Sequence, residues 1–190
     1  MKEIAILTDS TSDLSEELLK KYEIIRFPLH IHLGEKEYSD GIDIQPQDIY
    51  DWSEQTKETP KTSAISLDTA MKYLKKGLEE AKEVICFCIS ESMSSCYSIM
   101  QMAVQEMEVE DKVHIIDSAN LSTGIGLLII ETAEMIKEGK ATEEILEKIE
   151  EMKPKVRSSF VVDTLTYLHR GGRCSGAAAL AGNTLKIHPS

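Results

Sequence analysis

Four serines stand close together in the middle of the chain, between a short apolar run and a segment with helical spacing of apolar residues. They are Ser90, Ser92, Ser94 and Ser95, and the run before them, 84–89, is typical of a buried strand. The serines are therefore expected on a turn between a strand and the amino end of a helix. Backbone N–H groups there lack internal partners and carry partial positive charge, so the turn can hold an anion. The alternative is that the serines only cap the helix.

Two further strand ends show the same arrangement. A strand expected at 4–7 runs into the hydroxyl-rich turn 8–13, and a strand at 113–116 ends at Asp117 and Ser118. Strands alternating with helices predict an α/β fold with a mostly parallel sheet flanked by helices. Ligands gather at the carboxyl ends of such strands, so the three turns are expected to converge. Serine and aspartate also favour turns for local reasons, which leaves both interpretations open.

The other expected elements follow from apolar periodicity and from proline and glycine positions. They are a helix near 14–19 capped by Asp13 or Ser15, a strand at 24–33 around Pro28, a return strand near Tyr38, a helix at 48–55 begun by Pro46, an irregular loop at 56–66, helices at 67–81, 98–107, 124–136 and 142–152, a strand at 160–162, a helix at 165–169 and a final apolar helix. The pattern restarts after residue 153. This predicts an amino-terminal domain over 1–153 and a second α/β domain over 154–190, begun but truncated at the carboxyl end.

Composition excludes several classes of partner. The 190 residues are 42% apolar and 28% charged, as in an ordinary globular chain. The net charge is -12, with 33 acidic and 21 basic residues and no basic run, so we expect no nucleic-acid partner and at most transient membrane contact. The amino terminus resembles no signal peptide and no stretch is long enough for a membrane span, which favours a cytoplasmic protein.

Metal-ligand spacing is missing from the sequence. The four cysteines are dispersed without a C-x-x-C pair: Cys86, Cys88, Cys96 and Cys174. The first two would share one strand face, as buried reduced thiols do. His30 and His32 also share a strand face, with no third ligand visible nearby. We therefore expect neither a metal nor a cofactor.

Catalytic motifs are missing as well. A serine nucleophile needs a general base and normally a G-x-S-x-G elbow, and the residues 93–95 lack the flanking glycines. Phosphate-loop and dinucleotide fingerprints are absent from the sequence. An open turn at 170–173, R-G-G-R, places Arg173 where it could contact an anion. The residues therefore favour holding an anion through neutral hydrogen bonds over catalysis.

Five motifs in order give the chain a resemblance to the DegV family that covers nearly all 190 residues. They are T-D-S-T-S-D-L at 8–14, K-T-S at 61–63, S-x-x-x-S at 90–94 with Tyr97, I-D-S at 116–118 and Y-L-x-R-G-G-R at 167–173. The resemblance implies a two-domain α/β protein that buries the tail of one long-chain fatty acid, such as palmitate or oleate. It further implies a non-catalytic acyl carrier that presents the carboxylate to a separate fatty-acid kinase subunit.

The resemblance also implies the site. Thr62 and Ser94 match the family's two carboxylate contacts, and Arg173 matches its G-G-R arginine near the head group. Supporting candidates are Ser10, Ser63, Ser95 and Ser118. The chain departs from the family's usual L-S-G-T-Y, reading M-S-S-C-Y at 93–97, and from its T-S-Q-P-S, reading T-S-A-I-S at 62–66. Two alternatives remain: a serine-dependent esterase or acyl transferase using Ser94, and an interaction domain whose serines only cap helices.

Overall fold

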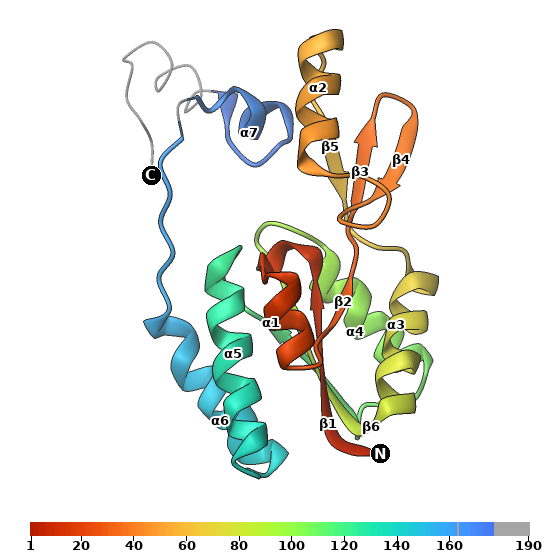
Figure 1. Cartoon of the computed structure of the whole chain (residues 1–190), viewed down its shortest axis with the longest axis vertical. Helices are drawn as coiled ribbons and strands as arrows, with labels where there is room; N and C mark the ends of the chain where they lie inside the picture. Colours follow the sequence, from red (N-terminus) through yellow and green to blue (C-terminus); the bar gives the residue numbers. More distant parts are fainter. Residues whose placement is uncertain (163, 177–190) are drawn as a thin grey trace. The chain divides into compact units, whose positions relative to one another are not determined.

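The computed structural model describes residues 1–162 and 164–176 (Figure 1). The chain divides into two compact units, the first made of residues 1–29 and 64–158, the second of 30–63 and the segment from 159 onward. The sequence predicted a single boundary after residue 153. The second unit also takes in 30–63, because the chain leaves the first unit after Leu29 and returns at Ala64.

The first unit is built on a four-stranded parallel sheet. Its strand order is β2-β1-β6-β7, and every neighbouring pair is parallel. The strands are β1 (Lys2–Asp9), β2 (Ile25–Phe27), β6 (Ala81–Cys88) and β7 (Val113–Asp117). In the centre of the sheet Leu7 lies between Ile25 and Cys86, and Cys86 in turn lies beside Ile115. The predicted α/β fold with a parallel sheet is confirmed.

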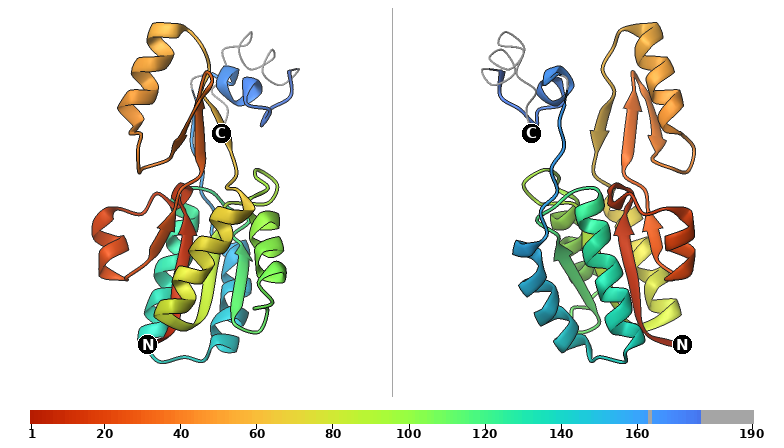
Figure 2. Two further views of the ribbon diagram at one scale, coloured as in Figure 1. Left: turned by 90° about the vertical axis from the view of Figure 1, so that its right-hand side faces the viewer. Right: turned by 60° about the vertical axis from the view of Figure 1, so that its left-hand side comes forward.

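Helices cover both faces of this sheet, as Figures 1 and 2 show. The helices α3 (Leu67–Glu80) and α4 (Cys96–Glu106) pack on one face, and α1 (Glu16–Lys21), α5 (Thr123–Lys137) and α6 (Thr142–Met152) pack on the other. Successive side chains of a strand point to opposite faces, so Leu7 enters the core under α3 while Ile6 enters the core under α5. Short 3-10 turns follow β1 and α6, η1 (Ser10–Ser12) and η2 (Lys153–Lys155).

Local chemistry explains where two of the helices begin. The Ser15 hydroxyl accepts a hydrogen bond from the Leu18 N–H at 3.3 Å, which settles the choice between Asp13 and Ser15 as the cap of α1. The Ser66 hydroxyl accepts from the Thr69 N–H at 3.2 Å and so caps α3. Both helix starts are therefore encoded by a serine just before the apolar periodicity.

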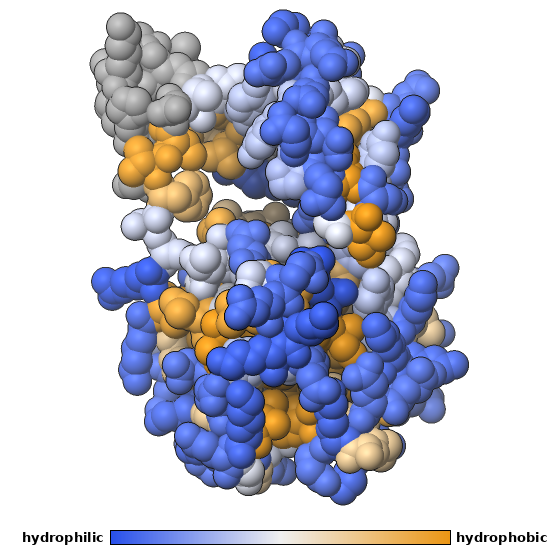
Figure 3. Space-filling model, in the orientation of Figure 1, coloured by the Kyte–Doolittle hydropathy of each residue, from blue (hydrophilic) through white to orange (hydrophobic). Residues whose placement is uncertain are grey.

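The second unit contains an antiparallel sheet of order β4-β3-β5. Its described elements are β3 (His30–Leu33), β4 (Lys36–Ser39), α2 (Pro46–Thr56), β5 (Lys61–Ser63) and α7 (Thr166–Arg170). A small core joins the sheet to α2, with Ile31, Leu33 and Ile44 buried and Trp52 packed against them. Figure 3 shows hydrophilic side chains along the outward face of α2, in keeping with a helix that has no fully buried residue.

Three predicted elements are wrong. The single strand expected at 24–33 is two strands in different sheets, because Pro28 has no N–H to donate to a ladder. The loop expected at 56–66 contains β5, which is stabilised by pairing with β3 rather than by its own apolar residues. Residues 160–162, expected as a strand, are irregular. The apolar helix expected at the end of the chain lies outside the described residues.

Among the residues that the structure describes, no helix has both the length and the apolar character needed to cross a membrane.

Candidate functional site

Three turns meet at the carboxyl edge of the first unit's sheet. The Ile89 N–H donates to Oδ2 of Asp9 at 2.6 Å, which joins the turn after β6 to the end of β1. The Ser118 N–H donates to the Cys88 carbonyl at 3.2 Å and joins the turn after β7 to β6. The predicted convergence of the three strand ends is therefore confirmed by direct hydrogen bonds.

Asp9 organises this edge. It is fully buried, and its Oδ1 accepts from both the N–H of Thr11 at 2.9 Å and the Thr11 hydroxyl at 2.5 Å. Burial raises the pKa of Asp9 above its ordinary value, while the bonds from Thr11 and Ile89 act in the opposite direction by favouring the ionised form. The carboxylate is thus used internally, to shape two turns.

Asp117, the last residue of β7, has a similar role on the other side of β6. Its Oδ1 accepts from the N–H groups of Glu91 at 3.1 Å and Ala119 at 3.0 Å. The sequence analysis treated both aspartates only as turn residues and missed their long-range bonds. The available signal was the shared pattern of an aspartate followed by serine at the end of a strand, in T-D-S and again in I-D-S.

Ser94 combines a capping role with a free donor. Its Oγ accepts from the N–H of Cys96, the first residue of α4, at 3.2 Å. The hydroxyl proton of Ser94 is not used by that bond and can be donated to an anion. Ser95, at the N-cap position, is exposed and makes no side-chain capping bond. The strand-to-helix turn therefore presents two serine hydroxyls next to a helix start, as predicted.

Ser10 and Ser118 are engaged in the same edge. The Ser10 Oγ accepts from the N–H of Leu29 at 3.2 Å. Ser118 is fully buried, and its hydroxyl donates to the carbonyl of Asn120 at 3.1 Å while accepting from the N–H of Asn120 at 3.2 Å. In this structure both hydroxyls hold the turns together, and their role toward a ligand stays a prediction.

Thr62 and Ser63 lie side by side on β5 of the second unit but point to opposite faces of its sheet. Thr62 pairs with Ile31 and Ser63 pairs with His30 across the antiparallel ladder, where directly opposed residues share a face. The Ser63 Oγ lies 2.8 Å from Nε2 of His32. Thr62 is exposed and has its hydroxyl available, whereas Ser63 is tied to a histidine that the sequence analysis had not connected with it.

Arg173 also belongs to the second unit. It follows Gly172, whose φ of +79° requires a residue without a side chain, and its guanidinium donates to the carbonyl of Gly171. The side chain is exposed. The structure thus brings Ser10, Ser94, Ser95 and Ser118 to one sheet edge in the first unit, and it places Thr62, Ser63 and Arg173 in the second.

The pairing that a serine esterase would need is not seen at Ser94. Within the described residues, no imidazole hydrogen-bonds to its hydroxyl, and the serine in contact with a histidine is Ser63. Oε2 of Glu37 lies 3.8 Å from the same Nε2 of His32 that faces Ser63. A catalytic triad requires the acid at the other ring nitrogen, so these three groups do not have that arrangement.

Known proteins resemble this chain over nearly its whole length. The DegV family model, described as an uncharacterised protein family, matches residues 3–190. A DegV domain-containing protein of Caldanaerobacter subterraneus is 34% identical over 189 residues, which cover 100% of this chain and 67% of that relative.

Solved structures give the same result. A DegV family protein of Thermus thermophilus, whose solved structure is described as showing fatty-acid binding, has a TM-score of 0.85 and 31% identity to this chain. The match covers 96% of this chain and 65% of the Thermus chain. DegV of Bacillus subtilis, described as a fatty acid binding protein, has a TM-score of 0.84 and 29% identity. That match covers 96% of this chain and 64% of the Bacillus chain. The chain spans about two thirds of the length of these proteins. With the five motifs in order and the family model covering almost every residue, the chain belongs to the DegV family.

Proposed function

We propose that the chain binds a long-chain fatty acid whose carboxylate is held by the hydroxyls of Ser94 and Thr62. The observation that carries this proposal is the sheet edge of the first unit, where three turns converge and Ser94 retains an unused hydroxyl proton beside the start of α4. Support comes from relatives: a protein of Eubacterium ventriosum with a TM-score of 0.81 and 29% identity is titled a stearic acid-binding protein.

The energetics favour a division of labour between the tail and the head group. Burying a methylene contributes about 0.8 kcal/mol, so a long acyl chain supplies most of the affinity. The carboxylate then needs orientation more than strong pairing. Hydroxyl donors and helix N–H groups stabilise a carboxylate without a counter-ion and leave it open to a phosphoryl donor.

We therefore propose further that the chain is a non-catalytic acyl carrier. In this role it presents the carboxylate to a separate kinase subunit, which transfers the phosphoryl group and forms the acyl phosphate. The hydroxyls of Ser94 and Thr62 orient the head group, and the supporting candidates are Ser95, Ser10, Ser118 and Arg173. Ser63, which was also predicted as a supporting residue, points to the opposite face of β5 from Thr62. No cofactor is needed for this function, because the fatty acid itself is the ligand.

The direct test is mass spectrometry of the ligand extracted from gently purified protein, together with thermal unfolding in the presence of palmitate or oleate. We expect a fatty acid in the extract and a higher Tm with added ligand. The matched pair Ser94→Ala and Ser92→Ala should separate the site from its neighbourhood, with affinity lowered only by the first. No fatty acid, combined with no rise in Tm, would contradict the proposal.

The carrier role has its own test. Ser94→Ala should weaken acyl binding modestly and reduce phosphorylation by the partner kinase more strongly, because orientation is lost before affinity. Equal small effects on both would argue against the carrier role while leaving fatty-acid binding intact. Covalent labelling of Ser94 by a fluorophosphonate probe would favour the esterase instead.

A further inference from the structure

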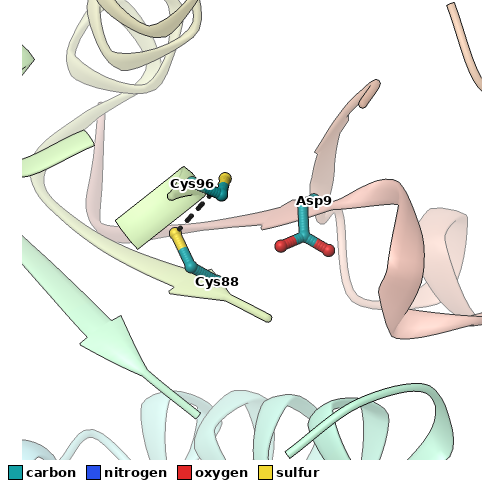
Figure 4. A group of neighbouring side chains, drawn as sticks. All are labelled: Asp9, Cys88 and Cys96. Carbon is teal, nitrogen blue, oxygen red and sulfur yellow. Dashed lines mark hydrogen bonds between the residues drawn. The ribbon is translucent and has the colours of Figure 1, made fainter. Parts of the chain in front are cut away.

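Two thiols and one carboxylate lie together beneath the turn that carries Ser94. Cys88 is the last residue of β6, Cys96 is the first residue of α4 and Asp9 is the last residue of β1, so three elements contribute one side chain each (Figure 4). The sulfur atoms and a carboxylate oxygen all lie within 4.8 Å of one another. All three residues are fully buried.

The spacing of the two thiols suits a tetrahedral metal ion. Both cysteines are free, and their sulfur atoms lie 3.9 Å apart. Two thiolates at about 2.3 Å from one Zn²⁺ in tetrahedral geometry lie about 3.8 Å apart. The observed distance therefore matches the edge of a zinc–thiolate site. Zinc accepts cysteine together with carboxylate oxygen, and a fourth position would be left for water.

The Asp9 carboxylate is already supported in the way that metal-ligating carboxylates usually are. Bonds from Thr11 and Ile89 fix its orientation, and they occupy three of the roughly four lone-pair positions that the two oxygens offer. One acceptor position therefore remains for an ion.

The two thiols share one buried environment. Contact with Cys86 raises the pKa of Cys88, and burial adds to this effect, whereas the contact with Cys96 acts in the opposite direction. Contact with Cys88 together with burial raises the pKa of Cys96. A divalent cation offsets the cost of ionising two buried thiols, because it stabilises both thiolates at once. The two thiol protons are released to solvent as the two metal–sulfur bonds form, and no oxidant or reductant takes part.

We propose that Cys88, Cys96 and Asp9 form a binding site for a thiophilic divalent cation, with Zn²⁺ as the ion that fits this ligand set. Bound there, the ion joins the ends of β1 and β6 to the start of α4. The ion also stabilises the turn that carries Ser94, because the backbone N–H of Cys96 donates to Ser94 Oγ. The site is separate from fatty-acid binding and does not depend on it.

The test uses the full chain, reduced and freed of metal, titrated with Co²⁺ as a spectroscopic substitute for Zn²⁺. We expect thiolate-to-cobalt charge-transfer absorption that saturates at one ion per chain and disappears when Zn²⁺ is added. Cys88→Ser and Cys96→Ser should each lose this absorption. Cys174→Ser is the matched control, because this free thiol lies in the second unit, and it should bind Co²⁺ as the wild type does.

Far-UV circular dichroism shows which variants are folded, and Cys96→Thr offers a second replacement of similar volume. Loss of the cobalt absorption in a folded Cys96 variant, with Cys174→Ser unaffected, supports the site. Absence of the absorption in the wild type overturns it. The proposal is also overturned if Cys88→Ser and Cys96→Ser both bind Co²⁺ as the wild type does. Loss of Co²⁺ binding in Cys174→Ser overturns it as well.

Discussion

The backbone N–H of Ile89 donates to the carboxylate of Asp9 across 2.6 Å, although the two residues are 80 positions apart in the sequence. This bond connects the end of β1 with the first residue of the turn after β6. The same carboxylate holds the turn after β1 through Thr11. One buried side chain therefore determines the relative position of the two hydroxyl-rich turns.

Asp9→Asn should lower the stability of the chain. The amide keeps the size of the carboxylate but offers only one acceptor oxygen, so a buried donor of Thr11 or Ile89 is left without a partner. Leaving one such donor unpaired costs about 1–3 kcal/mol. Urea unfolding followed by circular dichroism measures this change in the free energy of unfolding.

Asp13→Asn is the control for that experiment. Its Oδ2 accepts from the hydroxyl of Ser122 at 2.5 Å, but the residue is exposed. Its φ of +50° is one that asparagine also adopts. We expect less than about 0.5 kcal/mol of destabilisation. Equal losses for the two variants would show that burial of Asp9 is not what makes it important.

The sequence was sufficient for elements whose own residues encode them. Apolar runs and their spacing predicted the parallel sheet and the helices α1 and α3, with Asp13 or Ser15 as the expected cap of α1. It was insufficient where pairing between distant segments decides the structure. Lys61, Thr62 and Ser63 are all exposed, and they form β5 only because β3 provides a partner strand. No local pattern in the loop could have predicted it.

The same limit applies to the site. The convergence of three turns follows from the parallel arrangement of the strands, which the sequence predicted. The bonds made by Asp9 and the meeting of Cys88 with Cys96 depend on side-chain direction at the ends of different elements. The sequence analysis expected no metal because the cysteines and histidines are dispersed along the chain, but spacing along the chain does not report such contacts. Three dispersed ligands became neighbours only through the fold.

Gly77→Ala should destabilise the first unit even though alanine favours helices. An added Cβ would lie 2.9 Å from both Cδ1 of Leu7 and Cγ2 of Val84, where α3 packs on the sheet. Overpacking costs about 1–3 kcal/mol, against which the gain in helix propensity is about 1 kcal/mol. We expect a net loss of up to about 2 kcal/mol in urea unfolding.

Two further variants test the steric explanation of that loss. Lys76→Ala changes an exposed neighbour on the same helix and should have an effect within about 0.5 kcal/mol. Val84→Ala removes one of the two crowded methyl groups, so the double variant should be less destabilised than the sum of the single variants. Strict additivity would rule out the clash.

Glu134 provides a prediction for pH. The Tyr22 hydroxyl donates to its Oε1 at 2.7 Å, and this bond, with the Lys137 ammonium at 3.3 Å, holds the pKa of Glu134 below its ordinary value of 4.5. The ionised form is favoured in the folded chain. Its contribution to stability is therefore present above pH 4.5 and is lost as the pH falls through the lowered pKa.

Tyr22→Phe should raise the pKa of Glu134 toward 4.5, measured by NMR titration of the carboxyl carbon. The stability difference between the wild type and Tyr22→Phe should shrink as the pH falls below that value. Glu151 is the internal control, since Lys148 on α6 lowers its pKa independently of Tyr22. An unchanged Glu134 pKa would mean that the phenol does not stabilise the carboxylate.

Thr62 and Ser63 allow the carboxylate contact to be assigned to one face of β5. Thr62→Val keeps the shape of the side chain and removes its hydroxyl, so the Kd for oleate should rise about 3- to 10-fold if that hydroxyl donates to the head group. Ser63→Ala removes a hydroxyl on the opposite face, where its partner is His32, and should leave the Kd within about twofold. Isothermal titration with oleate distinguishes the two. Adjacent residues of a strand point their side chains to opposite faces of the sheet. A larger effect of Ser63→Ala would therefore place the head group on the face that carries His32.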